Sequence, residues 1–304
     1  MSFGLVFSGQ GMQHPAMLPW LTPDDALVQL TCARLGVADW RTSLEDAGWA
    51  ACNRHAQCLL TGLGLAVWQQ LAADLPPPAA IAGYSVGELA AFSVAGVLDA
   101  ATALDLARDR AAAMDRCAAD TPGGLLAVSG LAMPALDQLC HATGVAVAIR
   151  NGVDSAVIGG PHAALARAES QALHHNAHCT RLKISVASHT PWMQAAADSF
   201  AQTLEPLPFQ RPRNVLFSNA ADRILDAVQA KAALATQIAQ TVRWDECMDN
   251  LAARGVRCVL EIGPGQALAR IWNQRYPDIS GRACDDFRSA AAVVAWVRSH
   301  IRTE

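Results

Sequence analysis

A strand-turn-helix segment around Ser85 places the strongest constraint on how this chain can fold. Residues 79–82 are an apolar run of strand length, Gly83-Tyr84-Ser85-Val86-Gly87 is a glycine-bounded turn, and residues 89–97 are typical of a buried helix. A serine between two glycines at such a junction is the nucleophile-elbow arrangement, in which the glycines allow a sharp turn. The N–H groups of the following helix can stabilise an oxyanion. The segment predicts an α/β fold with Ser85 as a candidate nucleophile, and the alternative is an ordinary serine N-cap.

The chain is long and apolar enough for a large core. Its 304 residues are 52% hydrophobic and 16% charged, which indicates a globular α/β domain with room for a smaller companion. The net charge of −4 gives no electrostatic footprint for nucleic acid or for an anionic membrane. The nine cysteines form no C-x-x-C pair, and neither a signal peptide nor an apolar run of transmembrane length is visible. We therefore expect a cytoplasmic protein with free thiols and with no nucleic-acid or membrane partner.

Two more predicted strands end in glycine-rich loops. Residues 3–7 run into Ser8-Gly9-Gln10-Gly11-Met12-Gln13, and residues 258–262 run into Gly263-Pro264-Gly265. Residues 215–219 form a further apolar run of strand length. Because α/β proteins place ligand-facing backbone in the loops after their strands, we expect the first of these loops to face a ligand.

The helix predicted for residues 101–117 carries an arginine on its apolar face. The residues three, four and seven positions from Arg110 are alanine, leucine, methionine or cysteine, so no acidic partner shares that face. A buried guanidinium is unfavourable unless an anion meets it. Arg110 is therefore predicted either to pair with a carboxylate from another element or to bind the carboxylate of a substrate in bidentate fashion.

The segment after Thr121-Pro122-Gly123-Gly124 predicts a small inserted subdomain. Its elements follow the order strand (125–129), helix (134–142), strand (145–150), strand (155–159), helix (161–174), strand (180–186). This β-α-β-β-α-β order is the ferredoxin-like signature. The expected organisation is a large α/β domain of residues 1–123 and 188–304, with a ferredoxin-like subdomain of residues 124–187.

Histidines supply two candidate sites. His189 comes just past the last predicted strand of the insert, where a side chain can face a cleft, and it is the best-placed general base among the nine histidines. The alternative for His189 is a structural, hydrogen-bonded role. His174, His175 and His178 lie close to Cys179 in sequence, but they lack a recognised metal-ligand spacing. We expect the polar end of a surface helix there, and no metal.

Seven motifs occur in a fixed order along almost the whole chain. They are residues 8–13, Gly83 to Glu88, Arg110, residues 151–160, Ser188-His189, Gln237 to Trp244 and Glu261 to Gly265. This ordered set resembles the malonyl-CoA:acyl carrier protein transacylase family. Four positions depart from the family pattern: Tyr84 stands where histidine is usual, Ser155 where glutamine is common, and Ser8 and Ala187 where proline is usual.

The resemblance implies an α/β-hydrolase-like large domain and a ping-pong transfer of a malonyl group. It assigns Ser85 as nucleophile, His189 as general base, the main-chain carbonyl of Gln237 as the group that orients His189, the backbone N–H groups of Gln10 and Val86 as the oxyanion hole, and Arg110 as the partner of the malonyl carboxylate. Malonyl-CoA would be the substrate, and the phosphopantetheine-type arm of an acyl carrier protein the acceptor. No tightly bound cofactor is expected.

The departures bear on which carrier the enzyme serves. Tyr84 followed by Val86-Gly87-Glu88 is most similar to the malonate decarboxylase epsilon subunit, so we expect that complex's carrier subunit as acceptor and its other subunits as possible partners. A fatty-acid or polyketide transacylase is the alternative within the family, and residues 186–189 imperfectly resemble the pattern of enzymes that accept methylmalonyl groups.

Two alternatives come from other classes of protein. A serine thioesterase or esterase would normally add a carboxylate between Ser85 and His189 in chain order, and it would have no need for Arg110. A non-catalytic module that only docks a carrier protein is disfavoured by the presence of Ser85, Arg110 and His189 together.

Overall fold

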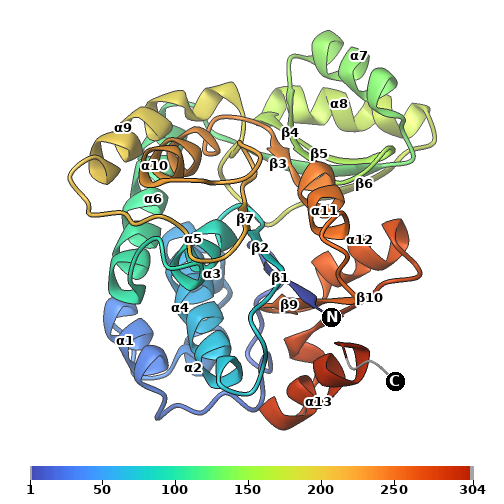
Figure 1. Ribbon diagram of the computed structural model, residues 1–304. Helices are drawn as coiled ribbons and strands as arrows, with labels where there is room; N and C mark the ends of the chain where they lie inside the picture. Colours follow the sequence, from blue (N-terminus) through green and yellow to red (C-terminus); the bar gives the residue numbers. More distant parts are fainter. Residues whose placement is uncertain (1, 302–304) are drawn as a thin grey trace.

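A five-stranded parallel sheet forms the centre of the computed structural model, which describes residues 2–301 (Figure 1). The strand order is β10-β9-β1-β2-β7. The strands are β1 (Phe3–Phe7), β2 (Ala80–Gly83), β7 (Leu216–Phe217), β9 (Cys258–Ile262) and β10 (Ser280–Ala283). In register, Leu5 of β1 lies opposite Ile81 of β2 and Leu260 of β9. Because all strands run the same way, the loops after β1, β2 and β9 meet at one edge of the sheet.

Helices cover both faces of this sheet, which explains why its central strands are fully buried and, apart from Glu261 in β9, apolar. Phe3, Leu5 and Phe7 pack into one core with α4, whereas Val6 packs on the other face with residues of α11 and α12. The helices of this part are α1 (Ala26–Leu35), α2 (Trp40–Ser43), α3 (Ala47–Ala51), α4 (Asn53–Ala72), α5 (Gly87–Val94), α6 (Ala100–Asp120), α9 (Gln194–Leu204), α10 (Ala227–Thr236), α11 (Trp244–Ala252), α12 (Ala267–Arg275) and α13 (Ala290–Ile301), with 3₁₀ turns η1 (Pro191–Met193) and η2 (Cys284–Asp286).

A second sheet, of mixed direction, forms the smaller part at the top of Figure 1. Its strand order is β6-β3-β5-β4-β8. The elements are β3 (Gly123–Ser129), α7 (Met133–Thr143), β4 (Ala146–Arg150), β5 (Ser155–Pro161), α8 (His162–His174), β6 (His178–Arg181) and β8 (Val242–Arg243). The first six follow the predicted β-α-β-β-α-β order, with antiparallel pairing among their strands. The predicted fold class, a parallel α/β domain with a ferredoxin-like subdomain, is confirmed.

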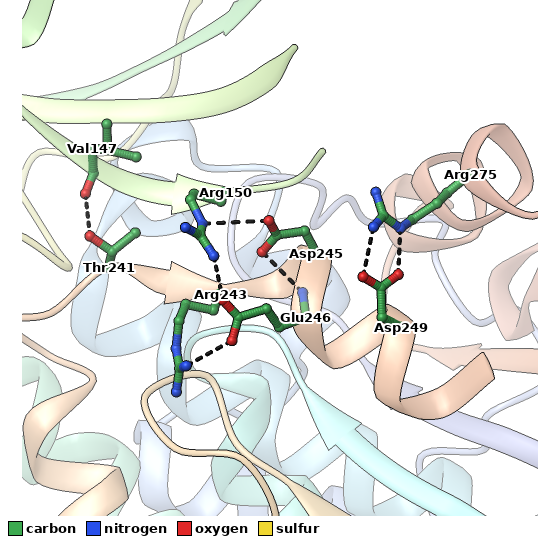
Figure 2. Close-up of polar contacts among 8 residues, drawn as sticks. All are labelled: Val147, Arg150, Thr241, Arg243, Asp245, Glu246, Asp249 and Arg275. Carbon is green, nitrogen blue, oxygen red and sulfur yellow. Dashed lines mark hydrogen bonds and ion pairs between the residues drawn. The ribbon is translucent and has the colours of Figure 1, made fainter. Parts of the chain in front are cut away.

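The fifth strand of the small sheet comes from outside the segment predicted for the insert. β8 follows α10 in the chain and pairs in parallel with β4, so that Ile149 lies opposite Val242. Figure 2 shows how polar contacts reinforce this junction. The Thr241 hydroxyl donates to the carbonyl of Val147 at 2.7 Å, and Arg150 lies 3.4 Å from the carboxylate of Asp245. The segment between α10 and α11 is therefore attached to both parts of the molecule.

Two predicted strands are shorter than expected. The strand predicted for residues 180–186 ends at Arg181, and the one predicted for residues 215–219 spans only Leu216–Phe217. In the first case exposed and partly buried side chains do alternate, but the pairing with β3 ends at the hydrogen bond from the Leu182 N–H to the Leu125 carbonyl, and Leu182 and Ile184 line a cavity between the two sheets. In the second case the chain turns away so that Asn219 can hydrogen-bond with the Ser85 turn.

The histidine run near residue 175 takes its place in ordinary secondary structure. His174 hydrogen-bonds the carbonyl of Ser170 near the end of α8, and His178 begins β6. Within residues 2–301, no three His, Cys, Asp or Glu side chains are grouped so that they could hold a metal ion. Over the same residues, no helix has the length and apolar character needed to cross a membrane.

Candidate active site

The turn between β2 and α5 holds Ser85 in a strained conformation. Ser85 has φ +55°, in the left-handed region that non-glycine residues rarely adopt. Its two flanking glycines are required by close contacts. A Cβ on Gly83 would lie 2.2 Å from the backbone of Gly87, and a Cβ on Gly87 would lie 2.4 Å from the carbonyl oxygen of Phe7. The elbow predicted from the sequence is therefore a tight crossing of backbone against β1.

Replacing Gly83 with alanine is expected to destabilise the protein, because the methyl group would meet backbone atoms that cannot move aside. Overpacking of this kind costs about 1–3 kcal/mol, and backbone contact places this site at the upper end. Thermal unfolding of Gly83→Ala would measure the loss. Gly152→Ala is the matched control, since a Cβ there has no neighbour within 4 Å, and an equal change in Tm for both variants would contradict the steric explanation.

His189 meets Ser85 from the far side of the cavity. Its Nε2 lies 2.7 Å from the Ser85 Oγ, and its Nδ1 lies 2.5 Å from the main-chain carbonyl oxygen of Gln237. A carbonyl oxygen only accepts, so Nδ1 must carry the proton, and Nε2 is left with its lone pair toward the serine hydroxyl. The His189 backbone is held by a 2.8 Å hydrogen bond to the carbonyl of Ile238. The pair has the geometry of a nucleophile and its general base.

Arg110 lies beside this pair without a carboxylate partner. The side chain is 1% exposed, and it donates to the Gln57 Oε1 at 2.7 Å and to the Gln237 Oε1 at 3.0 Å. A third contact of 3.4 Å reaches the Ser85 Oγ. In the described part of the chain no Asp or Glu lies within 4.0 Å of Arg110, so the alternative of a direct carboxylate pair is not what the structure shows. The guanidinium is solvated by neutral amides, which leaves its charge available to an anion.

Two backbone N–H groups near Ser85 are free to bind an oxygen. Val86 is the N-cap of α5, and Gln10 lies in the loop after β1 that lines the same cavity. Among residues 2–301 neither N–H donates to another protein group. The N–H of Ser85 itself is unavailable, because it donates to the Asn219 Oδ1 at 2.7 Å. This arrangement is compatible with the oxyanion role expected for Gln10 and Val86.

Burial sets the protonation states at this site. Burial, and then the positive charge of Arg110, lowers the pKa of His189 to about 3, although the Gln237 carbonyl opposes the change. His189 is therefore neutral at physiological pH and can accept a proton. Burial also lowers the pKa of Arg110 to about 10, which is still above physiological pH, so the guanidinium stays charged. The buried Glu88 carboxyl has its pKa raised by burial to about 7, with hydrogen bonds and Arg110 opposing the shift.

The cavity above Ser85 has a volume of about 240 Å³ and lies between the two sheets. Ser85, His189, Gln10 and Tyr84 line its polar end. Apolar side chains line most of the rest, from the small sheet, from the segment after β6 and from α12: Leu125, Ile149, Val157, Leu182, Ile184 and Ile271. The Tyr84 hydroxyl donates to the Asn151 Oδ1 at 3.2 Å across the gap between the elbow and the small subdomain. The site is a mostly apolar chamber, and the buried guanidinium of Arg110 lies 3.4 Å from the Ser85 Oγ that lines it.

Sequence reasoning missed three residues that hold this site together: Gln57, Glu88 and Asn219. Gln57 lies in the second turn of α4, where it accepts from Arg110. Asn219 ends a predicted strand, and a polar residue at that position was the available signal. Glu88 was part of a quoted motif, but nothing in the sequence shows that its carboxylate is 0% exposed.

Comparison with known proteins gives a consistent result. A sequence model described as the acyl transferase domain matches residues 5–302. The chain is 28% identical over 305 residues to the malonyl CoA-acyl carrier protein transacylase of Haemophilus influenzae, covering 96% of this chain and 97% of the relative. It superposes on the malonyl CoA-acyl carrier protein transacylase of Coxiella burnetii with a TM-score of 0.92 and 26% identity, covering 99% of this chain and 98% of that one.

A second similar structure is a complex. It contains a malonyl-transacylase bound to its acyl carrier protein from a type II polyketide synthase, and it matches with a TM-score of 0.90 and 27% identity over 97% of this chain and 99% of that one.

Proposed function

Because this chain belongs to the malonyl-CoA:acyl carrier protein transacylase branch of the acyl transferase family, we propose that it moves a malonyl group from malonyl-CoA to the thiol of an acyl carrier protein. The observation that carries the proposal is the 2.7 Å contact between Ser85 Oγ and His189 Nε2, beside a buried arginine that has no carboxylate partner within residues 2–301. A nucleophile and its base explain acyl transfer, and the arginine explains the choice of a dicarboxylic acyl group.

In the first half-reaction, Ser85 Oγ attacks the thioester carbonyl while His189 Nε2 takes the hydroxyl proton. The carbon–sulfur bond breaks, a malonyl ester forms on Ser85, and the coenzyme A thiolate leaves with the proton from His189. The developing oxyanion accepts hydrogen bonds from the N–H groups of Gln10 and Val86. The main-chain carbonyl of Gln237 stabilises the imidazolium at its Nδ1 side, a role that aspartate has in many other serine enzymes.

In the second half-reaction the carrier thiol enters the same cavity. His189 removes the thiol proton, the thiolate attacks the Ser85 ester, and the serine regains its proton as the malonyl thioester leaves. The acceptor is a phosphopantetheine-type arm, whose thin, uncharged chain suits a narrow and mostly apolar chamber. The protein itself needs no bound cofactor for either step.

Arg110 is the proposed partner of the malonyl carboxylate. The guanidinium is charged, buried and bonded only to amide oxygens and to the nucleophile, so an entering carboxylate provides the anion that it lacks. Acetyl groups offer no such charge. The expected result is selectivity for malonyl over acetyl groups.

An acyl carrier protein of fatty-acid or polyketide synthesis is the carrier best supported by the similar proteins, one of which is bound to such a carrier. The carrier subunit of malonate decarboxylase is a second candidate, and the observation in its favour is Tyr84 beside the nucleophile. Malonyl transfer measured to each purified carrier in turn would separate the two.

The proposal is tested by the intact mass of the purified protein after brief incubation with malonyl-CoA, and again after addition of a pantetheine thiol. We expect a gain of one malonyl group that the thiol then removes. An adduct formed only with another acyl-CoA would overturn the substrate, and an adduct that water removes as fast as the thiol does would indicate a thioesterase. Absence of an adduct with every thioester would overturn the transferase assignment.

A further inference from the structure

Glu88 is a fully buried carboxylate that the proposed reaction does not use. It lies on α5, one helical turn after Ser85, and makes no ion pair within 4.0 Å in the described chain. Both of its oxygens accept hydrogen bonds from amides. Oε1 accepts from the backbone N–H of Asn219 at 2.6 Å, and Oε2 accepts from the side-chain Nε2 of Gln237 at 2.9 Å. Unpaired carboxylates are rarely buried to this extent, because desolvation is costly.

The two residues anchored by Glu88 also hold Ser85 on both sides. The Asn219 Oδ1 accepts from the N–H of Ser85 at 2.7 Å, and its Nδ2 donates to the carbonyl of Gly83 at 2.6 Å. The Gln237 Nε2 donates to the carbonyl of Ser85 at 3.0 Å. The amide orientations follow from the partners, since N–H groups require Oδ1 or Oε1 and carbonyls require the NH₂ group. Each peptide group flanking the nucleophile is therefore fixed by a side-chain amide.

We call Asn219 and Gln237, with the Glu88 carboxylate that anchors them, the clamp. The clamp matters because Ser85 is in a conformation that a serine does not hold by itself. A residue with φ near +55° persists only when its surroundings over-determine it. Gln237 contributes a second link, because its main-chain carbonyl bonds the Nδ1 of His189 while its side chain bonds Ser85. Through Gln237, the carboxylate of Glu88 is thus linked by hydrogen bonds to both members of the nucleophile–base pair.

We propose that Glu88 is a positioning residue for the transfer reaction: by anchoring Asn219 and Gln237 on opposite sides of the Ser85 turn, it holds the nucleophile within hydrogen-bonding distance of His189. The inference rests on the proposed function, in which Ser85 is acylated. This role requires a side chain at position 88 with two oxygens that both accept hydrogen bonds, because both partners are N–H donors. A carboxamide at this position places an NH₂ group against one of two N–H donors, and one anchor is then lost.

The test is single-turnover acylation of Glu88→Gln by saturating malonyl-CoA, followed by intact mass. We expect the rate constant to fall roughly 10²-fold, since displacements of about 1 Å at a reacting pair cost that much. The final yield should still reach one malonyl group per chain, and the malonyl-CoA concentration for half-maximal rate should change by less than about threefold, because Glu88 does not touch the cavity.

The combination of slow rate and full yield separates positioning from a general loss of structure. A merely structural role would give a reduced yield at the wild-type rate, and that outcome would overturn the inference. So would a rate constant within about threefold of wild type. Val293→Ala, a buried position in α13 remote from the elbow, is a control for lowered stability and should keep the wild-type rate.

If Glu88→Gln fails to fold, Asn219→Ala provides the same test, because it removes the partners of the Ser85 N–H and the Gly83 carbonyl. The same loss of rate at full yield is expected, and an unchanged rate would overturn the clamp. Failure of the wild-type enzyme to acylate would overturn the proposed function and this inference together, and the wild-type arm of the experiment identifies that case.

Discussion

Replacing Ser85 with alanine is expected to abolish the covalent malonyl-enzyme and to lower kcat for malonyl transfer roughly 10⁴- to 10⁶-fold. Loss of a serine nucleophile has effects of that size because no acyl-enzyme can form, and only substrate binding and the oxyanion donors then contribute to catalysis. The hydroxyl deleted is the only atom that Ser85 contributes to the 2.7 Å contact with His189. Intact mass with malonyl-CoA, and transfer to a carrier thiol, would measure both parts of the expectation.

Ser93→Ala is the matched control for this substitution. Ser93 lies on α5, the helix that follows the elbow, and it does not line the cavity. The Ser93→Ala variant should be acylated at Ser85 like the wild-type enzyme. A malonyl adduct that persists in Ser85→Ala would place the nucleophile elsewhere.

Replacing Arg110 with alanine is expected to lower kcat/KM for malonyl-CoA far more than for acetyl-CoA. Removing one partner of a buried ion pair costs about 3–5 kcal/mol, so kcat/KM for malonyl-CoA should fall roughly 10²-fold or more. The acetyl group has no carboxylate that could pair with Arg110, so the slow turnover of acetyl-CoA should change by less than about tenfold. Parallel measurement of kcat/KM for the two thioesters checks the difference.

Arg108→Ala is the control for a lost arginine on the same helix. Arg108 is partly exposed and pairs with Asp105 at 3.5 Å and Asp109 at 3.7 Å on the surface, so its removal should leave both activities close to wild type. Equal losses for malonyl-CoA and acetyl-CoA in Arg110→Ala would refute a carboxylate-binding role.

The main elements of the fold were predictable because their patterns are local. The elbow combined a strand, a glycine-bounded serine and an apolar helix within a short stretch, and the structure has β2, the Ser85 turn and α5 there. The order of elements in the insert was likewise visible in the sequence. Strand lengths were not, since the run from Leu182 to Val186 alternates as a strand does, whereas Leu182 and Ile184 line a cavity. Periodicity reports which side chains are covered, not what covers them.

The candidate site likewise has residues that the sequence could mark and contacts that it could not show. Ser85 and His189 are marked by position next to predicted turns, and Arg110 by its place on an apolar face, so each could be singled out before any contact was known. The sequence could not show that Gln237 bonds Arg110, Ser85 and Glu88 through its side chain while its carbonyl bonds His189.

By itself, the sequence determined the class of fold, the likeness to malonyl transacylases and which side chains are candidates for the reaction, because these depend on residue type and local spacing. Only the tertiary structure decided that Arg110 hydrogen-bonds amides and pairs with no carboxylate among residues 2–301, that β8 joins the small sheet, and that Glu88 bonds Asn219 and Gln237 next to the Ser85 turn. The physical reason is distance along the chain. Residues 88, 219 and 237 meet through hydrogen bonds whose energy depends on ångström-scale geometry, and that geometry exists only after the two sheets and their helices have packed.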